Sequence, residues 1–300
     1  MIKRKIGIYR SVFPLYSEVF ITEQLKSYVS CSPTVICRDI KAENTDYDVF
    51  SVVGRFKKIA FSFFPRLNYL NGNGKIDGIF LLHAHFCPDA TFAMPLAKKL
   101  GVPLVVTCHG SDVTVGDKYL LASKKFYNYR YLIFRKKLFS DTQIFIAVSE
   151  FLKKSMISRG FPQEKIVTSY IGVDVDRFTP VIRRPIKEAP NGYIVSVARH
   201  THVKGVDVLL RAFSTVVKAH PALKLIQIGG GPLTDNLKKL AEDLGIASSL
   251  LFLGPKPSSE VLTYIQNSLA LVLSSRKSHD GAEEAFGLVL NEASACGIPC

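Results

Sequence analysis

The feature that most constrains the fold is an alternation of short apolar runs with stretches of helical periodicity, which continues along the whole chain. Such alternation favours a mostly parallel sheet with helices on both of its faces. In the first part of the chain, buried strands are predicted at 6–9, 34–37, 79–86, 103–110 and 144–149. Helices are predicted between them at 18–30, 88–100 and 119–139.

Several histidines lie where the predicted strands of this first series end. In open parallel sheets, ligands bind beyond the carboxyl ends of the strands. His83 and His85 lie at one such end, and the sequence His109-Gly110-Ser111-Asp112 lies at the next. His109 is thus placed to meet a substrate, although a structural histidine bonded within its turn is an equally good interpretation.

The pattern then begins again after a proline-containing linker. Further strands are predicted at 193–199, 223–232, 249–255 and 270–275, with helices at 206–219, 233–244, 258–267 and 285–296. We therefore predict an α/β protein of two doubly wound, Rossmann-like domains, 1–180 and 181–300, with the chemistry in a cleft between them. Because the second series has only four strands, we expect this domain to be incomplete and the sequence to be a fragment.

Composition excludes several classes of protein. With 47% hydrophobic and 21% charged residues, the chain is expected to be globular rather than disordered. No apolar run reaches the length of a transmembrane helix, and the basic start lacks the features of a secretory signal. The six cysteines form no Cys-x-x-Cys pair, which favours reduced thiols in a cytoplasm and gives no zinc framework.

The positive charge is concentrated in the first part of the chain. Residues 1–180 hold 26 basic and 15 acidic residues, a net +11, whereas residues 181–300 hold 13 and 10, a net +3. This imbalance indicates an acidic partner for the first domain: nucleic acid, anionic lipid or a phosphorylated metabolite.

Two basic stretches are rich in aromatic residues. Residues 118–137 contain seven Lys or Arg and no acid, and residues 55–70 are similar. Such segments can lie on an anionic membrane surface or stack on single-stranded nucleic acid, or they can be ordinary helices with a solvated basic face. Because no nucleic-acid-binding module is present, we favour the membrane over nucleic acid.

The segment 284–292 holds two carboxylates eight residues apart. Glu284 would lie just before a helix and Glu292 two turns inside it, where Glu292 could accept hydrogen bonds from sugar hydroxyls. The N–H groups of Phe286, Gly287 and Leu288 would then face a phosphate. The alternative is a helix whose acidic residues only complement its dipole.

Two cations follow the predicted strand 193–199. Arg199 and Lys204 are five residues apart, a pairing that can neutralise a diphosphate. An ordinary basic loop is the alternative. The run of three glycines at 229–231 lacks the Gly-Lys-Ser/Thr ending of a nucleotide-triphosphate loop, so it does not indicate an ATPase.

With these residues in place, the sequence resembles the retaining glycosyltransferases of family 4, which have the GT-B fold. The resemblance is densest at 81–114, at Ile171–Asp174 with Arg177 and Phe178, at 196–213 and at 284–292. Residues 13–25 and 81–114 are most similar to bacterial enzymes that assemble exopolysaccharide or lipopolysaccharide on lipid carriers. The segment from Arg10 to Pro14 departs from the glycine-rich loop usual after the first strand of this family.

The resemblance implies a role for each candidate residue. Arg199 and Lys204 would bind the donor diphosphate, Glu284 would contact the transferred sugar, and Glu292 would hold the ribose. The amides after Glu284 would hold phosphate. His109 would lie at the reacting centre, and Asp112 would support its loop. No metal or other cofactor is implied.

The predicted function is transfer of a hexose from a nucleotide diphosphate sugar to a lipid-linked or saccharide acceptor, with retention of configuration. The enzyme would be cytoplasmic and peripheral on the inner face of the cell membrane, with an anionic lipid surface and no nucleic acid as partner. The alternatives are a nucleotide-sugar epimerase of the same fold and a non-catalytic protein that binds nucleotide sugars or membrane surfaces.

Overall fold

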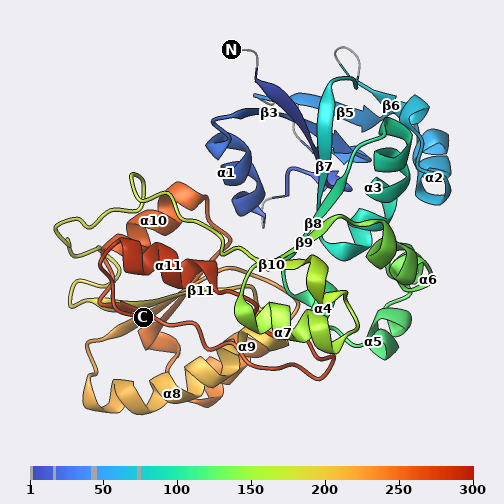
Figure 1. Cartoon of the computed structure of the whole chain (residues 1–300). Coiled ribbons are helices and arrows are strands. Elements are labelled where there is room, and N and C mark those ends of the chain that lie inside the picture. The colour runs from blue at the N-terminus through green and yellow to red at the C-terminus, as the bar shows by residue number, and fades with distance from the viewer. Residues whose placement is uncertain (1–2, 16–17, 42–45, 73–75) are drawn as a thin grey trace. The chain divides into compact units, whose positions relative to one another are not determined.

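The chain forms two compact units, Met1–Tyr170 and Ile171–Cys300, in a computed structural model (Figure 1). The structure describes residues 3–15, 18–41, 46–72 and 76–300. The predicted boundary near residue 180 is ten residues later than the observed division. The reason is that Phe178 is buried in the core of the second unit with Tyr193, so the segment before residue 180 packs with that unit.

Unit 1 is built on an eight-stranded sheet with the order β10-β9-β8-β7-β1-β3-β5-β6. Every pairing in it is parallel except that of β6 with β5. The strands are β1 (Arg4–Tyr9), β3 (Cys31–Cys37), β5 (Asp48–Val52), β6 (Leu70–Asn71), β7 (Ile79–His85), β8 (Leu104–Cys108), β9 (Ile144–Ala147) and β10 (Ile166–Thr168). A separate parallel pair joins β2 (Val12–Phe13) to β4 (Asp39–Ile40).

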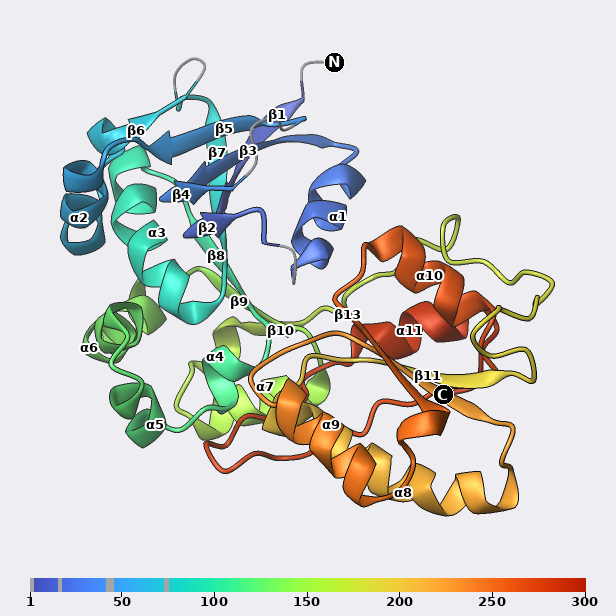
Figure 2. The ribbon, with the colours of Figure 1, turned by 180° about the vertical axis from the view of Figure 1, so that it is seen from behind.

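Helices cover this sheet in the way that the alternating pattern predicts. They are α1 (Val19–Ser27), α2 (Arg55–Phe63), α3 (Cys87–Leu100), α4 (Ser111–Thr114), α5 (Asp117–Ala122), α6 (Phe126–Asp141) and α7 (Glu150–Ser158), with 3-10 turns at Leu67–Tyr69 and Gln163–Lys165. Figure 2 shows α1 on one face of the sheet and α3 on the other. Strands β5, β6 and β10, which lie towards the edges of the sheet, were not predicted.

The helix predicted at 119–139 is two helices. α5 ends at Ala122 and α6 begins at Phe126, and between them Lys124 adopts a φ of 54°. A left-handed backbone conformation at a non-glycine residue interrupts the helical hydrogen bonds, so the prediction of one continuous helix is wrong. The basic stretch 118–137 is therefore divided between two separate helices, α5 and α6.

Unit 2 has a four-stranded parallel sheet with the order β13-β12-β11-β14. Its strands are β11 (Tyr193–Val197), β12 (Lys224–Ile228), β13 (Leu250–Gly254) and β14 (Ala270–Leu271). Its helices are α8 (Val206–Ala219), α9 (Thr234–Asp243), α10 (Ser258–Gln266) and α11 (Leu288–Ala295), with 3-10 turns at His202–Lys204 and Ala247–Ser249. Two apolar clusters pack on this sheet, one around Tyr193 and Ile265 and one around Leu210 and Phe213.

Helix α8 coincides with the predicted 206–219, but the last two predictions differ from the structure. The strand predicted at 270–275 pairs only at Ala270 and Leu271. The helix predicted at 285–296 begins at Leu288, because Gly287 adopts a left-handed φ of 70° and precedes the first turn. Phe286 and Gly287 therefore lie before the helix, and Glu292 lies about one turn inside it rather than two.

Among the described residues, none of the helices combines the length and the apolar character needed to cross a bilayer.

Candidate functional site

The candidate site of unit 1 lies where the strand order reverses. The chain runs from β1 to β3 and β5 on one side of the sheet, then returns to β7 on the other side of β1 and continues outward through β8, β9 and β10. Ligands bind at such reversals, beyond the carboxyl ends of the strands. Arg10 directly follows β1, His85 ends β7, and His109 directly follows β8.

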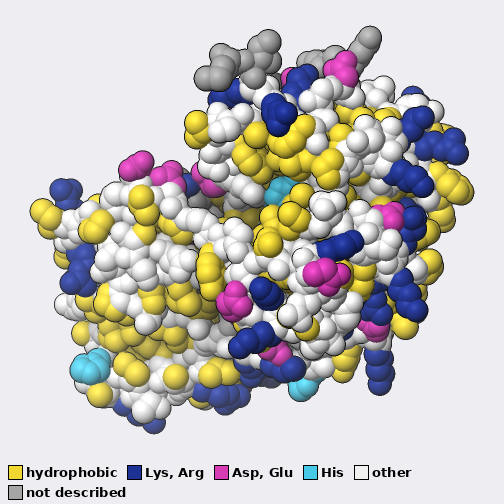
Figure 3. Space-filling view, in the orientation of Figure 1, with side chains coloured by type: hydrophobic (Ala, Val, Ile, Leu, Met, Phe, Trp, Pro, Cys, Tyr) yellow, Lys and Arg dark blue, Asp and Glu magenta, His cyan; other side chains and the backbone are white. Residues whose placement is uncertain are grey.

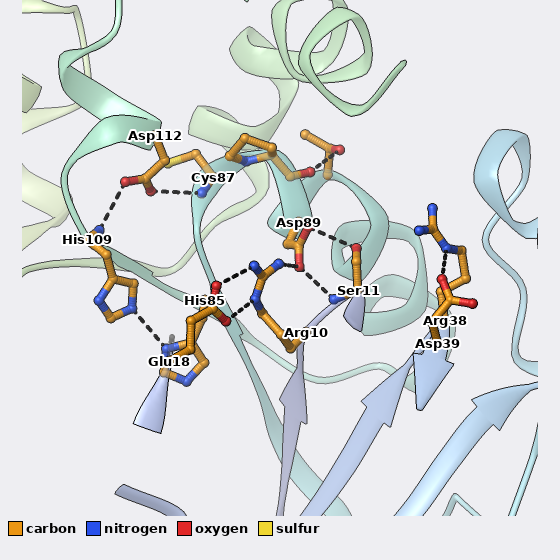
Figure 4. Close-up of polar contacts among 12 residues, drawn as sticks. Arg10, Ser11, Glu18, Arg38, Asp39, His85, Cys87, Asp89, His109 and Asp112 are labelled. Carbon is orange, nitrogen blue, oxygen red and sulfur yellow. Dashed lines mark hydrogen bonds and ion pairs between the residues drawn. The ribbon is translucent and has the colours of Figure 1, made fainter. Parts of the chain in front are cut away.

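Three histidines stack against one another at this edge. The ring centroids of His83 and His85 are 4.6 Å apart, and those of His85 and His109 are 5.3 Å apart. Nδ1 of His85 lies 3.0 Å from Nε2 of His109, and Figure 4 draws this hydrogen bond as a dashed line. His83 is hydrogen-bonded to Thr107 on the neighbouring strand, with its Nε2 2.7 Å from the Thr107 hydroxyl oxygen. The three rings therefore form one column, in which His85 stacks on His109 and is hydrogen-bonded to it, while His83 is tilted against His85.

Burial keeps these histidines neutral. It lowers the pKa of His83 to about 4 and that of His109 to about 3. The pKa of His85 is also lowered well below its usual value, first by burial and then by its neighbours His83 and His109. Since at most one of the two nitrogens between His85 and His109 carries a proton, one ring donates to the other.

The outward side of His109 is enclosed by aromatic rings. The rings of Phe20 and Phe86 lie 4.7 and 4.6 Å from the His109 ring, centroid to centroid. Nδ1 of His109 has no hydrogen-bond partner among the described residues, although it is buried. A buried ring nitrogen without a partner is costly unless a ligand or water satisfies it, so Nδ1 of His109 needs a partner that the described residues do not supply.

Asp112 organises the loop that carries His109. Its carboxylate accepts hydrogen bonds from the backbone N–H groups of His109, Gly110 and Cys87, at 3.0, 2.9 and 3.0 Å. The Cys87 bond ties the β8–α4 loop to the start of α3 (Figure 4). Asp112 is buried in the described structure and therefore positions His109 through the backbone.

The prediction from the residues overlooked a second network beside the histidines. The guanidinium of Arg10 pairs with Glu18 at 2.7 Å and also with Asp89 on α3. Asp89 accepts further hydrogen bonds from the backbone N–H and the hydroxyl of Ser11, at 2.6 and 2.8 Å. Burial opposes the charge of Arg10, but the two carboxylates raise its pKa.

This network explains how a loop without its usual glycines is held. Arg10 connects the end of β1 to the start of α1 through Glu18 and to α3 through Asp89. Its guanidinium also lies 4.7 Å from the ring centroid of Phe86. The departure at Arg10–Pro14 was the available signal, since a cation directly after a buried strand needs a partner. Ser17, which belongs to the same segment, lies outside the described residues.

The group of described residues that most resembles a metal site is Cys87, Cys108 and Asp112. The Asp112 carboxylate is already engaged by three backbone donors. Burial raises the pKa of both thiols, and metal ligation requires thiolates. The group therefore fits a structural role. The chain also contains the Asp-x-Asp sequence 174–176, in which Asp174 accepts from the backbone of Asp176 and Arg177 and so caps a turn.

The candidate site of unit 2 lies at the reversal between β11 and β14. The connection from β11 to β12 passes through α8 on one side, whereas β14 lies on the other side of β11. At the carboxyl ends of these two strands, the ammonium of Lys204 forms an ion pair with Glu284. Ser275 adds a hydrogen bond from its hydroxyl to the same carboxylate, at 2.9 Å.

The environment of Glu284 favours its charged form. Burial by itself opposes ionisation, but Lys204, Ser275 and the backbone of Gly287 together lower its pKa. The structure thus joins two residues that lie 80 positions apart in the sequence and that were predicted separately. It also engages Gly287, one of the predicted phosphate donors, with Glu284.

Gly205 allows Lys204 to reach this position. Gly205 has a φ of 58°, and a Cβ atom there would lie 2.1 Å from the carbonyl oxygen of Ser274. The hydroxyl of Ser274 donates to the carbonyl of Gly205 at 2.8 Å. Because only glycine fits, the loop after β14 can pack directly against the loop after β11.

The glycine run at 229–231 has a similar role. A Cβ at Gly229 would lie 2.1 Å from the carbonyl oxygen of Ala198, and one at Gly231 would lie 2.7 Å from that of His200. These glycines therefore pack against the loop that presents Arg199. His200 is buried there, with its Nδ1 2.8 Å from the hydroxyl of Thr234.

Arg199 and Glu292 complete the predicted set. Arg199 is exposed, and its side chain makes no ion pair with a described residue. Glu292 is partly buried on α11, and burial raises its pKa while Arg177 opposes that rise. Glu284 and Glu292 thus have different electrostatic environments although they are predicted from one motif. The free N–H groups at the start of α11 belong to Leu288 and Val289, rather than to Phe286.

Models of known protein families match both units. The model described as Glycosyltransferase Family 4 matches residues 30–177, and the model described as Glycosyl transferases group 1 matches residues 180–300. The chain belongs to the family 4 glycosyltransferases. The two matches meet between β10, the last strand of unit 1, and β11, the first strand of unit 2, so each family model corresponds closely to one unit of the structure.

Several curated glycosyltransferases are similar in sequence to this one. The putative colanic acid biosynthesis glycosyltransferase WcaL of Escherichia coli is 31% identical over 220 residues, which is 72% of this chain and 51% of WcaL. The amylovoran biosynthesis glycosyltransferase AmsK of Erwinia amylovora is 27% identical over 222 residues, 74% of this chain and 52% of AmsK. The chain thus spans about half the length of these relatives.

Solved glycosyltransferase structures share the fold of this chain over nearly its whole length. HepE of Anabaena, crystallised with UDP and glucose, matches with a TM-score of 0.67 and 16% identity, covering 99% of this chain and 79% of HepE. The lipopolysaccharide outer core galactosyltransferase WaaB matches with a TM-score of 0.59 and 18% identity, covering 99% and 79%. These matches confirm the predicted GT-B fold.

Proposed function

We propose that the protein transfers a hexose from a nucleotide diphosphate sugar to a lipid-linked or saccharide acceptor, with retention of configuration, in the assembly of a cell-surface polysaccharide. The observation that carries the proposal is the pairing of Lys204 with Glu284 at the strand reversal of unit 2, together with Arg199, which is exposed after β11 and forms no ion pair with a described residue. The relatives named for colanic acid and amylovoran biosynthesis support the polysaccharide, and HepE with UDP supports the donor.

In this proposal, unit 2 holds the donor. Arg199 and Lys204 bind the diphosphate, as a fork and as a point charge. The N–H groups at the start of α11 approach a phosphate oxygen, where the helix dipole favours negative charge. Glu292 accepts hydrogen bonds from the ribose hydroxyls, for which its carboxylate is suited because it has no hydrogen-bond partner among the described residues.

Glu284 has a different task from Glu292. Its lowered pKa keeps it ionised, so it orients Lys204 and accepts a hydrogen bond from the transferred sugar. As the sugar-phosphate bond lengthens, negative charge accumulates on the diphosphate, and Arg199 and Lys204 stabilise that charge. With two cations and a helix terminus in these positions, the proposed reaction needs no divalent metal.

Unit 1 contributes His109 to the reacting centre. The neutral ring presents Nδ1, which lacks a partner among the described residues, to a hydroxyl of the sugar. Asp112 supports this ring through the backbone. For retention, we propose that the acceptor attacks on the face from which the diphosphate departs, and that a diphosphate oxygen takes the acceptor proton.

A lipid-linked acceptor places the reaction at a membrane. We propose that the protein acts in the cytoplasm at the inner face of the cell membrane as a peripheral protein. The excess positive charge of residues 1–180 supports this location, because the inner leaflet carries anionic lipids.

The first test measures the melting temperature of the chain with UDP, GDP, ADP and their sugars. We expect one nucleotide to stabilise the protein, because a ligand that binds only the folded state raises its stability. Glu292→Ala should lose this shift, whereas Asn291→Ala, an exposed neighbour on the same helix, should keep it. Equal shifts for both variants would remove Glu292 from the donor site, and the absence of any shift would contradict the proposed donor.

The second test follows donor cleavage with and without EDTA. Transfer that persists in EDTA agrees with the proposed metal-free site, and transfer restored only by Mg²⁺ or Mn²⁺ contradicts it. Conversion of the donor sugar without any acceptor would instead identify an epimerase.

A further inference from the structure

Phe86 joins β7 to α3 with an unusual backbone conformation. Its φ is 68° and its ψ is 134°, a region in which the Cβ atom of an ordinary residue is crowded and which glycine normally occupies. Among the described residues, Lys124 is the one other non-glycine residue with a positive φ, at 54°. Strain of this kind persists only where the surroundings hold the chain in place, and it gathers at functional sites.

Hydrogen bonds on both sides of Phe86 hold this conformation. The backbone N–H of Phe86 donates to the carbonyl oxygen of Thr107 next to β8's end, at 2.8 Å, and the Phe86 carbonyl accepts from Ala90 in the first turn of α3, at 3.0 Å. The following residue, Cys87, donates its N–H to Asp112 at 3.0 Å. The sharp turn from strand to helix therefore falls on Phe86 itself.

The ring of Phe86 lies against His109. The two ring centroids are 4.6 Å apart, with an angle of 43° between the ring planes. The ring of Phe20 contacts the same imidazole, at 4.7 Å. In the space-filling view, histidine atoms are visible in a recess with hydrophobic side chains beside them (Figure 3). Apart from its bond to His85, the imidazole of His109 is thus held by apolar rings.

Arg10 contacts the Phe86 ring as well. Its guanidinium carbon lies 4.7 Å from the ring centroid, within the range of cation–π attraction. Arg10 itself is fixed, because its Nε and Nη2 donate to the two carboxylate oxygens of Glu18, each at 2.7 Å, and its Nη1 pairs with the buried Asp89. A row of contacts therefore runs from Asp89 through Arg10 and Phe86 to His109.

Core packing alone does not account for this arrangement. Phe86 is only partly buried, and it packs at the margin of the apolar cluster around Ile8 and Val35. Because hydrophobic stabilisation grows with the area buried, this ring gains less than a ring in the core. Partial burial gives no reason for a strained backbone, whereas the placement of the ring beside His109 does.

We propose that Phe86 is a positioning residue for His109: its strained backbone places the ring against the imidazole, and Arg10 keeps the ring there. The bond to His85 fixes where Nε2 of His109 points, and the Phe86 ring limits how far the imidazole turns about that bond. The inference rests on the proposed function, in which Nδ1 of His109 contacts the transferred sugar. The Arg10 network then acts on the reacting centre through Phe86.

The experiment compares three substitutions of Phe86 with two of Lys124. Phe86→Gly removes both the ring and the strain, Phe86→Ala removes only the ring, and Phe86→Tyr keeps the ring. Lys124→Gly and Lys124→Ala are the matched controls, because Lys124 also has a positive φ but is exposed between α5 and α6. For each chain, urea unfolding, initial rates of donor turnover and an NMR titration of the histidine rings are measured.

We expect stability and turnover to respond differently. At both positions the glycine variant should be more stable than the alanine variant, with an unfolding constant about fivefold smaller, because glycine relieves the strain. Phe86→Gly and Phe86→Ala should nevertheless lower kcat to the same extent, by about tenfold to a hundredfold, since small displacements of a reacting group have effects of this size. The donor KM should change less than kcat. Phe86→Tyr should keep most of the turnover, and both Lys124 variants should match the natural chain.

The NMR titration follows His109 without any substrate. Burial holds the pKa of its imidazole at about 3 in the natural chain. Phe86→Ala and Phe86→Gly should raise this pKa towards the unperturbed value of about 6.5, because water then reaches the ring. Phe86→Tyr should leave the pKa low. His220, which is exposed in unit 2, gives a reference signal.

Three results would overturn the inference. Turnover by Phe86→Ala equal to that of the natural chain would mean that the ring does not position His109. Higher turnover by Phe86→Gly than by Phe86→Ala would mean that turnover follows stability, as for a merely structural residue. An unchanged pKa of His109 in Phe86→Ala would mean that the ring does not enclose the imidazole. If the natural chain turned over no donor, the proposed function would fail, and the titration would still decide whether Phe86 holds His109.

Discussion

His85 and His109 share a hydrogen bond of 3.0 Å between Nδ1 and Nε2, although they belong to the ends of different strands. The parallel pairing of β7 with β8 brings these ends together. His85 therefore restricts the rotation of the His109 ring and sets which of its nitrogens carries the proton. The same bond holds the ring in the orientation that leaves its buried Nδ1 without a hydrogen-bond partner among the described residues.

The neutral histidine column makes unit 1 sensitive to acid. A histidine whose folded pKa is lowered binds its proton first in the unfolded state, so stability is lost as pH falls below the unfolded pKa of about 6.5. The loss continues until the folded pKa is reached, about 4 for His83 and about 3 for His109. We expect each buried histidine to cost about 2 kcal/mol between pH 6.5 and pH 5.

His85→Gln should therefore flatten the dependence of unfolding free energy on pH in this range, whatever it does to stability at neutral pH. Urea unfolding at several pH values measures the slope. His220→Gln, which changes an exposed histidine of unit 2, is the control and should leave the slope of unit 1 unchanged. Parallel slopes for His85→Gln and the natural chain would contradict the neutral column.

The Lys204–Glu284 ion pair should also lose its contribution to stability as pH falls. The folded pKa of Glu284 is lowered, so the pair contributes stability above the unfolded pKa and loses it as pH falls through the folded pKa. Lys204→Met should thus destabilise unit 2 by about 1–3 kcal/mol at neutral pH. The difference from the natural chain should shrink as pH falls through the lowered folded pKa of Glu284, because its carboxylate is then protonated.

Alanine substitutions at Lys204 and Glu292 separate binding from catalysis. In the proposed function Lys204 stabilises charge that grows on the departing diphosphate, so Lys204→Ala should mainly lower kcat, whereas Glu292→Ala should mainly raise the donor KM. Both constants come from initial rates of donor turnover. If the two variants turned over donor like the natural chain, the assignment of the site would fail.

Gly205 and Gly245 form a matched pair for testing the packing of the donor loop. Their φ values are 58° and 68°, so alanine is strained by about 1 kcal/mol at either position. At Gly205 the added Cβ also meets the Ser274 carbonyl at 2.1 Å, whereas at Gly245 no atom lies within 4 Å. Urea unfolding should show a clearly larger loss for Gly205→Ala, and equal losses would mean that the two loops do not pack as described.

Arg10→Met should destabilise unit 1 strongly. The substitution leaves the carboxylate of Asp89 buried without its cation, which costs about 3–5 kcal/mol when a buried pair loses one partner. Adding Asp89→Asn to Arg10→Met should recover part of the loss, because the uncompensated charge is then absent. Urea unfolding of the two single variants and the double variant measures this coupling, and strictly additive losses would exclude it.

Local patterns were enough to predict the central elements of both sheets. The apolar runs of β1, β7, β8 and β12 are buried on both faces, and such runs are visible in sequence whatever their neighbours are. Strand β6 was not predicted, and β14 was predicted too long. Both are only two residues long, and each pairs with a single neighbouring strand. The break at Lys124 and the late start of α11 at Leu288 are single backbone conformations that periodicity does not register.

The sequence by itself determined the alternation of strands and helices, the two units and the residue types available at each strand end, because these follow from local hydrophobic patterning. Only the tertiary structure decided which side chains meet: Lys204 with Glu284, Arg10 with Asp89, and Phe63 with Phe126. The physical reason is that strand order and helix packing bring together residues distant in the chain, and their contacts depend on distances of a few ångströms that no local pattern encodes.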